Sequence, residues 1–300
     1  MDFGRLETSQ LDSINFKLPA DAKRTTRILS KSKKPKNPVV YVGCAKWGRK
    51  DWIGKIYPKG TKDKDFLEQY AKQFNCIELN AIYYKLPSHE QIHDWKNKVG
   101  KDFLFCPKFT EAITHRRRLK NAKQETDLFL DAVNEFGKNL GPLFLMPHPQ
   151  MGPKKFDDIK DYLESLPRDL PLFLELRDPE WYEPEHKKTI FDLCEKLNVG
   201  SVITDTAGRR DCVHMELTTP YAFIRFVGNS LHQTDYKRID DWVQRIKQWI
   251  GEGIHGIYFF MHQHDELYSP ELIHYLIVEL NKHCHLKLKP PVFYSGNSLL

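Results

Sequence analysis

The sequence lacks several patterns that would assign a function class directly. No run approaches the ~18 consecutive apolar residues of a membrane-spanning helix, and the opening MDFGRLETSQ contains no apolar core of a secretory signal. The six cysteines form no CxxC pair and follow none of the usual zinc spacings. No GxGxxG turn directly follows an apolar, strand-like run. We therefore expect a cytoplasmic protein without membrane contact, disulfide framework or dinucleotide fingerprint.

The size and composition favour one folded domain. A chain of 300 residues with 40% hydrophobic and 12% aromatic residues can build a sizeable core. The formal net charge is +6, but residues 1–38 hold nine Lys or Arg and four Asp or Glu, so this segment supplies +5 and leaves +1 for the rest. Few aromatics and no clear period predict a flexible basic extension there, and its charge leaves open an arm for nucleic acid. We expect a single domain over residues 39–285 and a tail over residues 286–300.

Short apolar runs alternate with segments of helical period after Pro38. This alternation predicts right-handed βαβ units and a parallel sheet, and eight such units predict a TIM-like (β/α)8 barrel. The expected strands are residues 39–45, 76–80, 103–109, 141–147, 171–177, 201–206, 222–228 and 257–262. An open, doubly wound sheet is the alternative, but no glycine-rich turn supports it. Residues 207–220 show no helical period, so we expect an irregular link there, with a short strand at 214–217.

Ionisable or amide side chains occur near the carboxyl ends of these runs. In a strand that is buried on both faces, a charge needs a partner, a ligand or a solvated opening. The set is Glu78, Asn80, Lys108, Glu175, Arg177, Asp205, Arg225 and His262. Residues two apart in a strand point to the same side, so we expect the acids and cations of this set to meet inside the barrel. Because catalysis in such barrels sits at the carboxyl ends of the strands, we place the candidate site there.

Two interpretations of this polar set stay open. One is a self-satisfied salt-bridged network that only stabilises the barrel; the other is a site whose function offsets the desolvation of clustered charges. In the second interpretation the catalytic candidates are Glu78, Lys108, Glu175 and Asp205. Arg177 and Arg225 can grip a carboxylate or phosphate with their planar guanidinium groups. The other substrate-binding candidates, from strand ends and loops, are Trp47, Asn80, Tyr84, His115, Trp181 and His262.

A metal site is the weaker alternative for the same residues. A divalent ion would need the three acids and a histidine of the last strand to converge without cations among them. Lys108, Arg177 and Arg225 are interspersed with those acids. We therefore predict no metal and no other cofactor.

Several ordered sequence blocks resemble the DUF72 family, also called YecE-like proteins, between residues 39 and 281. The block VGCAKWGRKDWIGKIYPKG (42–60) is similar to the family's Gly, small residues and Trp running into W-x-G-x-(F/I)-Y-P. The block FNCIELNAIYYKLP (74–87) is similar to F-N-x-(I/V)-E-(I/L)-N followed by an aromatic pair and L-P. The chain departs from the family at Met146, where a glutamine is usual, and in IYFFMHQH (257–264), where asparagines are common. The resemblance implies a TIM-barrel-like fold and no particular reaction.

Taken together, the residues favour an enzyme of unassigned reaction that binds a small phosphate- or carboxylate-bearing substrate at the strand ends. One alternative is a nucleic-acid-binding or endonuclease-like barrel, which the basic extension and the HRRR run at 115–118 would suit. The other is a non-enzymatic ligand-binding protein that uses the same residues. The sequence indicates neither the substrate nor the oligomeric state.

Overall fold

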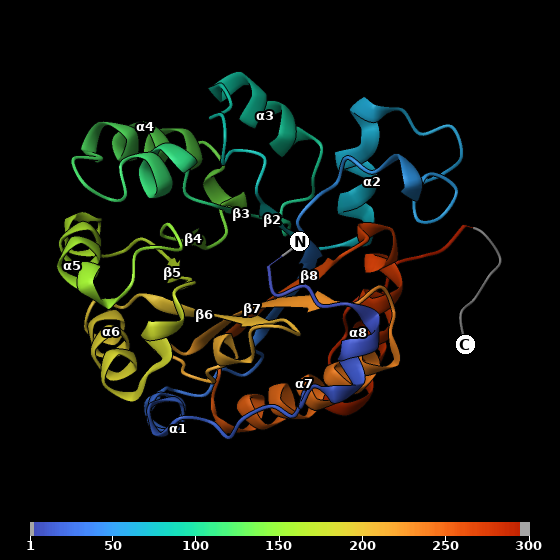
Figure 1. Cartoon of the computed structure of the whole chain (residues 1–300). Helices are drawn as coiled ribbons and strands as arrows, with labels where there is room; N and C mark the ends of the chain where they lie inside the picture. Colours follow the sequence, from blue (N-terminus) through green and yellow to red (C-terminus); the bar gives the residue numbers. More distant parts are fainter. Residues whose placement is uncertain (1–2, 295–300) are drawn as a thin grey trace.

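The computed structural model describes residues 3–294, in which parallel strands alternate with helices (Figure 1). The strands are β1 (Val39–Cys44), β2 (Cys76–Leu79), β3 (Leu104–Pro107), β4 (Leu143–Leu145), β5 (Leu172–Leu174), β6 (Gly200–Asp205), β7 (Tyr221–Gly228) and β8 (Gly256–Gln263). The helices are α1 (Lys23–Lys31), α2 (Phe66–Gln73), α3 (His89–Asn97), α4 (Lys123–Asn134), α5 (Phe156–Ser165), α6 (Pro184–Lys196), α7 (Gln233–Glu252) and α8 (Ser269–Cys284). None of these helices is long and apolar enough to cross a membrane.

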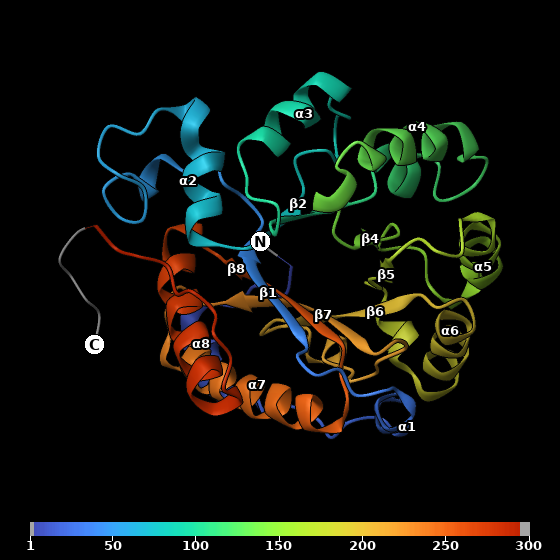
Figure 2. The ribbon, with the colours of Figure 1, turned by 180° about the vertical axis from the view of Figure 1, so that it is seen from behind.

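The strands form two parallel sheets. Six of them pair in the order β1-β8-β7-β6-β5-β4, and this sheet curls around the centre of the molecule, while β2 and β3 pair separately on the opposite side (Figures 1 and 2). The architecture is therefore an α/β fold built on a curled six-stranded parallel sheet. The eight predicted strands are all present, in the predicted order.

Hydrogen bonds cross both gaps between the two sheets. Between β1 and β2, the Asn75 side chain accepts from the Val42 N–H at 2.8 Å and donates to the Val40 carbonyl at 3.0 Å. An amide side chain thus replaces a ladder of backbone hydrogen bonds. The strands come so close here that a Cβ on Gly43 would clash with the Cys76 carbonyl oxygen. Between β3 and β4, the Gly141 N–H donates to the Phe105 carbonyl at 2.7 Å.

Two apolar clusters hold these layers. The larger lies between the strands and the helices, where α7 illustrates the sequence pattern: its Ile239, Trp242, Val243, Ile246 and Trp249 recur at helical spacing and are all buried. The second cluster is enclosed by the strands themselves. It consists of Cys76, Cys106, Phe144, Phe173, Val202, Phe223 and Phe260, one side chain from each strand from β2 to β8. These seven residues show which alternate positions of the strands face the interior.

The segment before β1 is folded, which corrects the prediction of a flexible extension. Helix α1 lies between α6 and α7 (Figures 1 and 2). Its Arg24 pairs with Asp192 and Glu195 of α6 and with Glu216, and its Thr25 hydroxyl donates to the Met215 carbonyl at 2.7 Å. Basic residues that suggested an external partner thus neutralise acids of the same chain.

Helix α1 occupies the place of a helix that the link between β6 and β7 does not supply. As predicted, residues 207–220 are irregular, with only a short 3-10 turn, η8 (Arg210–Cys212). The prediction of a strand at 214–217 is wrong, because these residues pair with α1 through single hydrogen bonds such as Ala22 N–H to the Met215 carbonyl, at 3.3 Å. After α8, residues 286–294 contain no helix or strand, and the rest of the predicted tail lies outside the described residues.

Candidate functional site

Ionisable side chains from five strands, or from the residues just after them, meet directly above the enclosed apolar cluster, on its carboxyl-terminal side. We call this group the cup, and it consists of Glu78, Lys108, Glu175, Arg177, Arg225 and His262. Each follows by two or four residues a member of the enclosed cluster, as Glu78 follows Cys76 and Arg225 follows Phe223. The alternation in the sequence therefore correctly predicts that these side chains converge.

Arg225 is the centre of the cup. Its Nε and Nη2 donate to the two carboxylate oxygens of Glu78, each at 2.8 Å. Its Nη1 donates to both oxygens of Glu175, at 2.9 and 2.7 Å. The guanidinium is only 2% exposed, so one cation joins two carboxylates away from water. Such forked bonds fix both the position and the charge of each carboxylate.

The two carboxylates have further donors. Arg177 Nη2 lies 2.6 Å from Glu175, whose same oxygen accepts the Thr204 hydroxyl at 2.6 Å. Glu78 accepts from Asn80 Nδ2 at 2.8 Å, and His262 Nε2 lies 3.1 Å from its other oxygen.

These donors decide the charge state of both acids. Burial alone would raise the pKa of each carboxyl, but Arg225 and His262 hold the pKa of Glu78 well below its usual range. In the same way Arg177 and Arg225 outweigh burial and lower the pKa of Glu175 to about 2. Both groups are therefore fixed anions at neutral pH, which makes them poor proton donors or acceptors.

Lys108 differs from the rest of the cup. Its Nζ lies 4.2 Å from the centre of the Tyr83 ring, and no carboxylate of residues 3–294 approaches it within 4.0 Å. Burial, reinforced by the charge of Arg225, lowers the pKa of Lys108 to about 8. Since Glu78 and Glu175 are matched by the two guanidinium groups, the ammonium of Lys108 is the unmatched charge of the cup.

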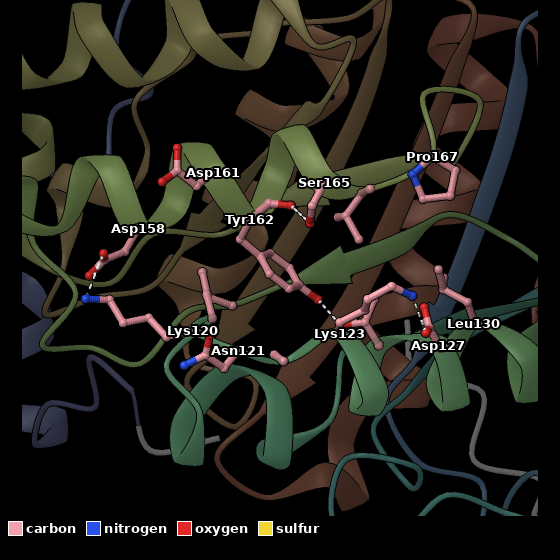
Figure 3. A pocket seen from close by; sticks show the side chains of 14 residues that line it. Lys120, Asn121, Lys123, Asp127, Leu130, Asp158, Asp161, Tyr162, Ser165 and Pro167 are labelled. Carbon is pink, nitrogen blue, oxygen red and sulfur yellow. Dashed lines mark hydrogen bonds and ion pairs between the residues drawn. The ribbon is translucent and has the colours of Figure 1, made fainter.

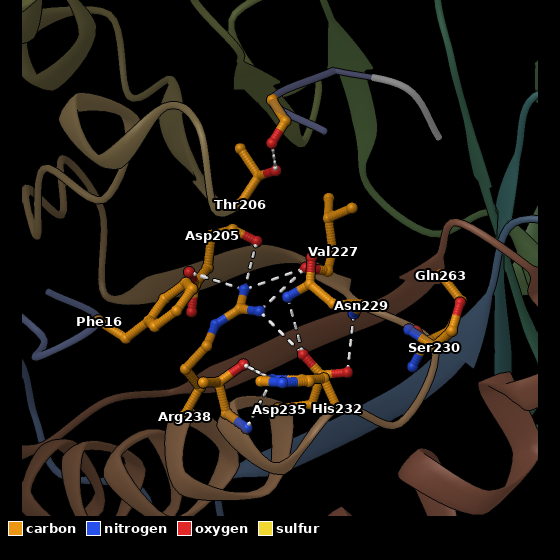
Figure 4. Close-up of polar contacts among 12 residues, drawn as sticks. Phe16, Asp205, Thr206, Val227, Asn229, Ser230, His232, Asp235, Arg238 and Gln263 are labelled. Atoms are coloured by element: carbon orange, nitrogen blue, oxygen red, sulfur yellow. Dashed lines mark hydrogen bonds and ion pairs between the residues drawn. The ribbon is translucent and has the colours of Figure 1, made fainter. Parts of the chain in front are cut away.

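Asp205 does not belong to the cup, and the prediction that it faces the interior is wrong. The interior positions of β6 are Val202 and Thr204, so the side chain of Asp205 points outward to α7 (Figure 4). There it accepts from Arg238 Nη2 at 2.9 Å and from the Trp242 indole N–H at 2.7 Å, and it also pairs with Arg210. Arg238 and Arg210 outweigh burial and lower its pKa. The contacts of this carboxylate join a strand to a helix.

The aromatic residues that the sequence suggests as substrate contacts differ in how deeply they are buried. Trp181 is 1% exposed and its indole N–H donates to the Met151 carbonyl at 2.7 Å, so it packs in the core and the prediction that it contacts substrate is corrected. Trp47 is half-buried and packs edge-on against Trp95. Tyr84 is 79% exposed, and its ring meets the edge of Tyr83, which is the ring that faces Lys108.

The start of the chain lies over the cup. The ring of Phe3 stacks 3.5 Å from the guanidinium of Arg177. The carbonyl of Phe3 accepts the Thr206 hydroxyl at 3.0 Å, and the carbonyl of Gly4 accepts the Gly208 N–H at 2.8 Å. We call Phe3 and Gly4 the N-terminal strap. The sequence gives no periodic pattern that would predict this strap, because the strap consists of only two residues.

The basic run at 115–118 lies beyond Tyr83, in the link after β3. The ring of His115 is 5.6 Å from that of Tyr83, which places His115 next to the cup. Arg116 and Arg117 form ion pairs with Glu111 and Glu125 instead of facing Lys108. Arg118 donates to the Gln150 side chain at 3.2 Å, so His115 is the residue of the run whose ring contacts Tyr83.

A groove of ≈ 610 Å³ lies on the outer surface between α4 and α5 (Figure 3). Its walls include ion pairs of Lys120 with Asp158 at 3.0 Å and of Lys123 with Asp127 at 2.6 Å. It contains no residue of the cup. Both lysines of the groove are thus paired with acids of the same groove.

An HExxH sequence, residues 89–93, also lies outside the cup. It begins α3, and its two histidines face α4, where His89 Nε2 is 3.0 Å from Asp131 and His93 Nε2 is 2.7 Å from Glu135. Both histidines are about half exposed. Within residues 3–294 no group of three or more potential ligands is arranged to hold a metal ion. In this fold the motif joins two helices through contacts between histidine and carboxylate side chains.

The fold and the cup together define an α/β protein of parallel strands with a charged, interior-facing site at their carboxyl ends. The chain belongs to the protein family of unknown function DUF72, whose pattern matches residues 41–292. The resemblance seen in the sequence is therefore confirmed.

Curated relatives and solved structures agree with this assignment. The chain is 28% identical over 263 residues to the UPF0759 protein YecE of Escherichia coli, covering 81% of this chain and 93% of YecE. It is 25% identical over 154 residues to the UPF0759 protein YunF of Bacillus subtilis, covering 49% of this chain and 53% of YunF. A DUF72 family protein of Enterococcus faecalis superposes with a TM-score of 0.66 at 16% identity, over 85% of this chain and 98% of that one. One of Thermotoga maritima gives 0.59 at 20% identity, over 83% and 100%. These structures share the fold.

Proposed function

We propose that the protein is an enzyme that binds a small phosphate- or carboxylate-bearing molecule at the cup, with Lys108 as the group that meets its anionic end. The observation that supports this most directly is the unmatched ammonium of Lys108 beside two carboxylates that are already paired. A half-buried cation with no counterion has lost hydration without regaining an ion pair. An anionic ligand would supply that missing partner.

Lys108 also suits proton transfer. With a pKa of about 8, it gains and loses a proton close to physiological pH, which general acid and base catalysis requires. Glu78 and Glu175, which the sequence also suggests as catalytic, remain ionised and orient Arg225. In this proposal they position the site, and Lys108 moves the proton. The neutral amine is also the form that adds to a carbonyl carbon.

The proposal includes a closed arrangement of the two sheets. The side chain of Asn75 at one gap and the bond between Gly141 and Phe105 at the other support an eight-stranded (β/α) barrel with two irregular seams. The enclosed apolar cluster, to which β2 through β8 contribute, supports the same closure. In such a barrel the cup is the standard position for catalysis.

Calorimetric titration of the full chain with inorganic phosphate at pH 7.5 tests the proposal. Replacing Lys108→Met should weaken phosphate binding roughly 10- to 100-fold, the worth of a hydrogen bond to a charged group. The matched control is Lys85→Met, an exposed lysine of the same region, which should bind phosphate as the parent does. Equal binding by the Lys108→Met variant and the parent would refute the proposal.

The pH dependence gives a second, independent check. Sulfate is the better probe here because it keeps its charge throughout the range. Since only the protonated amine attracts an anion, sulfate affinity should be constant below a pH of about 8 and should fall above it. In Lys108→Met the residual affinity should not change over that range.

A further inference from the structure

The neighbours of His115 determine which of its two ring nitrogens carries the proton. The Thr114 hydroxyl donates its only hydrogen to the Thr110 carbonyl at 2.9 Å. The same oxygen lies 2.8 Å from His115 Nδ1, so we assign it as the acceptor there and place the proton of the ring on Nδ1. Burial, reinforced by His148 and then by Lys108 and Arg118, lowers the pKa of His115 to about 4 and keeps the imidazole neutral. The Nε2 of His115 is therefore a bare acceptor.

His148 has the opposite arrangement. The backbone N–H of Gln150 donates to His148 Nδ1 at 3.1 Å, so this nitrogen carries no proton when the ring is neutral. Burial lowers the pKa of His148, which favours the neutral ring. The proton then sits on Nε2, and the Nε2–H of His148 is a donor.

The two imidazoles lie side by side next to the cup. Their ring centres are 5.0 Å apart, and the backbone N–H of His148 donates to the Thr114 carbonyl at 3.3 Å, which ties the two loops together. The ring of Tyr83 lies 5.6 Å from the ring of His115 and 4.2 Å from Lys108 Nζ, so it contacts both residues. Within residues 3–294 no hydrogen bond reaches Nε2 of either histidine, and neither atom is a buried, unsatisfied one.

We propose that His115 and His148 form a hydroxyl-binding pair, and that the ligand of the cup is therefore a small hydroxylated phosphate or carboxylate, of the sugar-phosphate or sugar-acid type. This inference deepens the proposed function and rests on it. A hydroxyl group donates one hydrogen bond and accepts others, so it suits one bare nitrogen and one N–H. Lys108 meets the anionic end of such a molecule, and the two histidines meet a hydroxyl farther along it.

The choice of a hydroxyl follows from the charges. Neither ring offers a cation to a second anionic group, because both are held neutral, and the neighbouring Arg118 guanidinium is bonded to the Gln150 side chain at 3.2 Å. An apolar group would leave an N–H and a bare nitrogen without partners, which is unfavourable once water is displaced. A neutral group that both donates and accepts satisfies both atoms.

A matched pair of ligands tests the inference with the full chain. Glycerol 3-phosphate and propyl phosphate have three carbons and one phosphate each, but only the first carries hydroxyl groups. Calorimetric titration at pH 7.5 should show that the parent protein prefers glycerol 3-phosphate by roughly 10-fold, which corresponds to one or two net hydrogen bonds. The variants His115→Asn and His148→Asn should each reduce that preference to roughly 3-fold or less.

Asparagine is the informative replacement because it keeps the contact nearest the backbone. Its amide can donate to Thr114 in place of His115 Nδ1, and its carbonyl oxygen can accept from Gln150 in place of His148 Nδ1. Only the Nε2 function is lost. The affinity of both variants for propyl phosphate should therefore equal that of the parent, which also shows that the loops are intact.

The outcomes separate the inference from the proposed function. If the parent binds both phosphates equally, and Lys108→Met binds neither, the hydroxyl-binding pair is refuted and the anion site stands. If the parent binds neither phosphate, both are refuted.

A long-range ¹H–¹⁵N spectrum checks the geometry without any ligand, because His115 should show the Nδ1–H form and His148 the Nε2–H form. The reverse forms would overturn the inference.

Discussion

Replacing Arg225→Met should destabilise the protein, and the loss should depend on pH. The change removes the cation that both Glu78 and Glu175 share, and leaves two carboxylates that are 0% and 1% exposed. Breaking a buried ion pair by removing one partner costs about 3–5 kcal/mol. Urea unfolding at pH 7.5 should therefore show a free energy of unfolding lower by about that amount.

The sign of the pH dependence follows from the pKa shifts. In the parent protein both carboxyl pKa values lie below those of the unfolded chain, so their stabilisation is complete above the ordinary glutamate pKa and is lost as the pH falls toward about 2. Without Arg225, burial is opposed at Glu78 by His262 and at Glu175 by Arg177, so both pKa values should rise, and that of Glu78 should rise above its unfolded value. When the pH falls below the raised pKa of a carboxyl, protonation of that carboxyl restores about 1.4 kcal/mol of the free energy of unfolding for each further pH unit. The deficit of the variant should be smaller at pH 5 than at pH 7.5.

A charge-balanced double variant is the control. Glu78→Gln with Arg225→Met removes one charge of each sign and leaves Glu175 paired with Arg177, so the deficit of the double variant should be smaller than that of Arg225→Met and should depend less on pH between 5 and 7.5. A deficit of Arg225→Met that is the same at both pH values would refute the account of the cup as a desolvated ion network. So would a deficit below about 1 kcal/mol.

Three further changes test other parts of the structure. Gly43→Ala should lower the free energy of unfolding by about 1–3 kcal/mol, measured by urea unfolding, because its Cβ would clash with the Cys76 carbonyl where β1 meets β2; an unchanged value would contradict the close approach. Phe3→Ala should raise the affinity for inorganic phosphate severalfold in calorimetry, since it uncovers the Arg177 guanidinium. The matched control is Phe16→Ala, whose ring faces Arg238 instead and which should not change phosphate binding. Deleting residues 1–31 should lower the melting temperature, because α1 covers the surface between α6 and α7.

The sequence predicted the order of the strands and most of the cup. The strands are apolar on both faces, so a charge near a strand end stands out, and the two-residue period places Glu175 with Arg177 on one side. For Asp205 the same rule failed, because a run such as SVITDT does not show which of its two sides faces the interior. The neighbour Thr204 is the residue that bonds to Glu175, and only the position of β6 relative to β5 and β7 decides this.

Long-range packing explains the other differences. Trp181 follows a strand in a loop, which favours an exposed ring, but its N–H reaches the Met151 carbonyl 30 residues earlier in the chain and the ring is buried. The composition of residues 1–38 suggests a flexible segment. It does not show that Arg24 pairs with acids of α6, because these acids lie far away in the sequence. No local pattern carries this information.

The position of α1 has a consequence for how the chain folds during synthesis. The surfaces that hold α1 belong to α6, to the link around Met215 and to α7, which are made some 150 to 220 residues later. At about 5–20 residues per second, α1 leaves the ribosome on the order of ten seconds or more before its partners do. An isolated helix of nine residues is marginal in water, so α1 should stay unstructured until then. The first helix of the chain is thus among the last to be fixed.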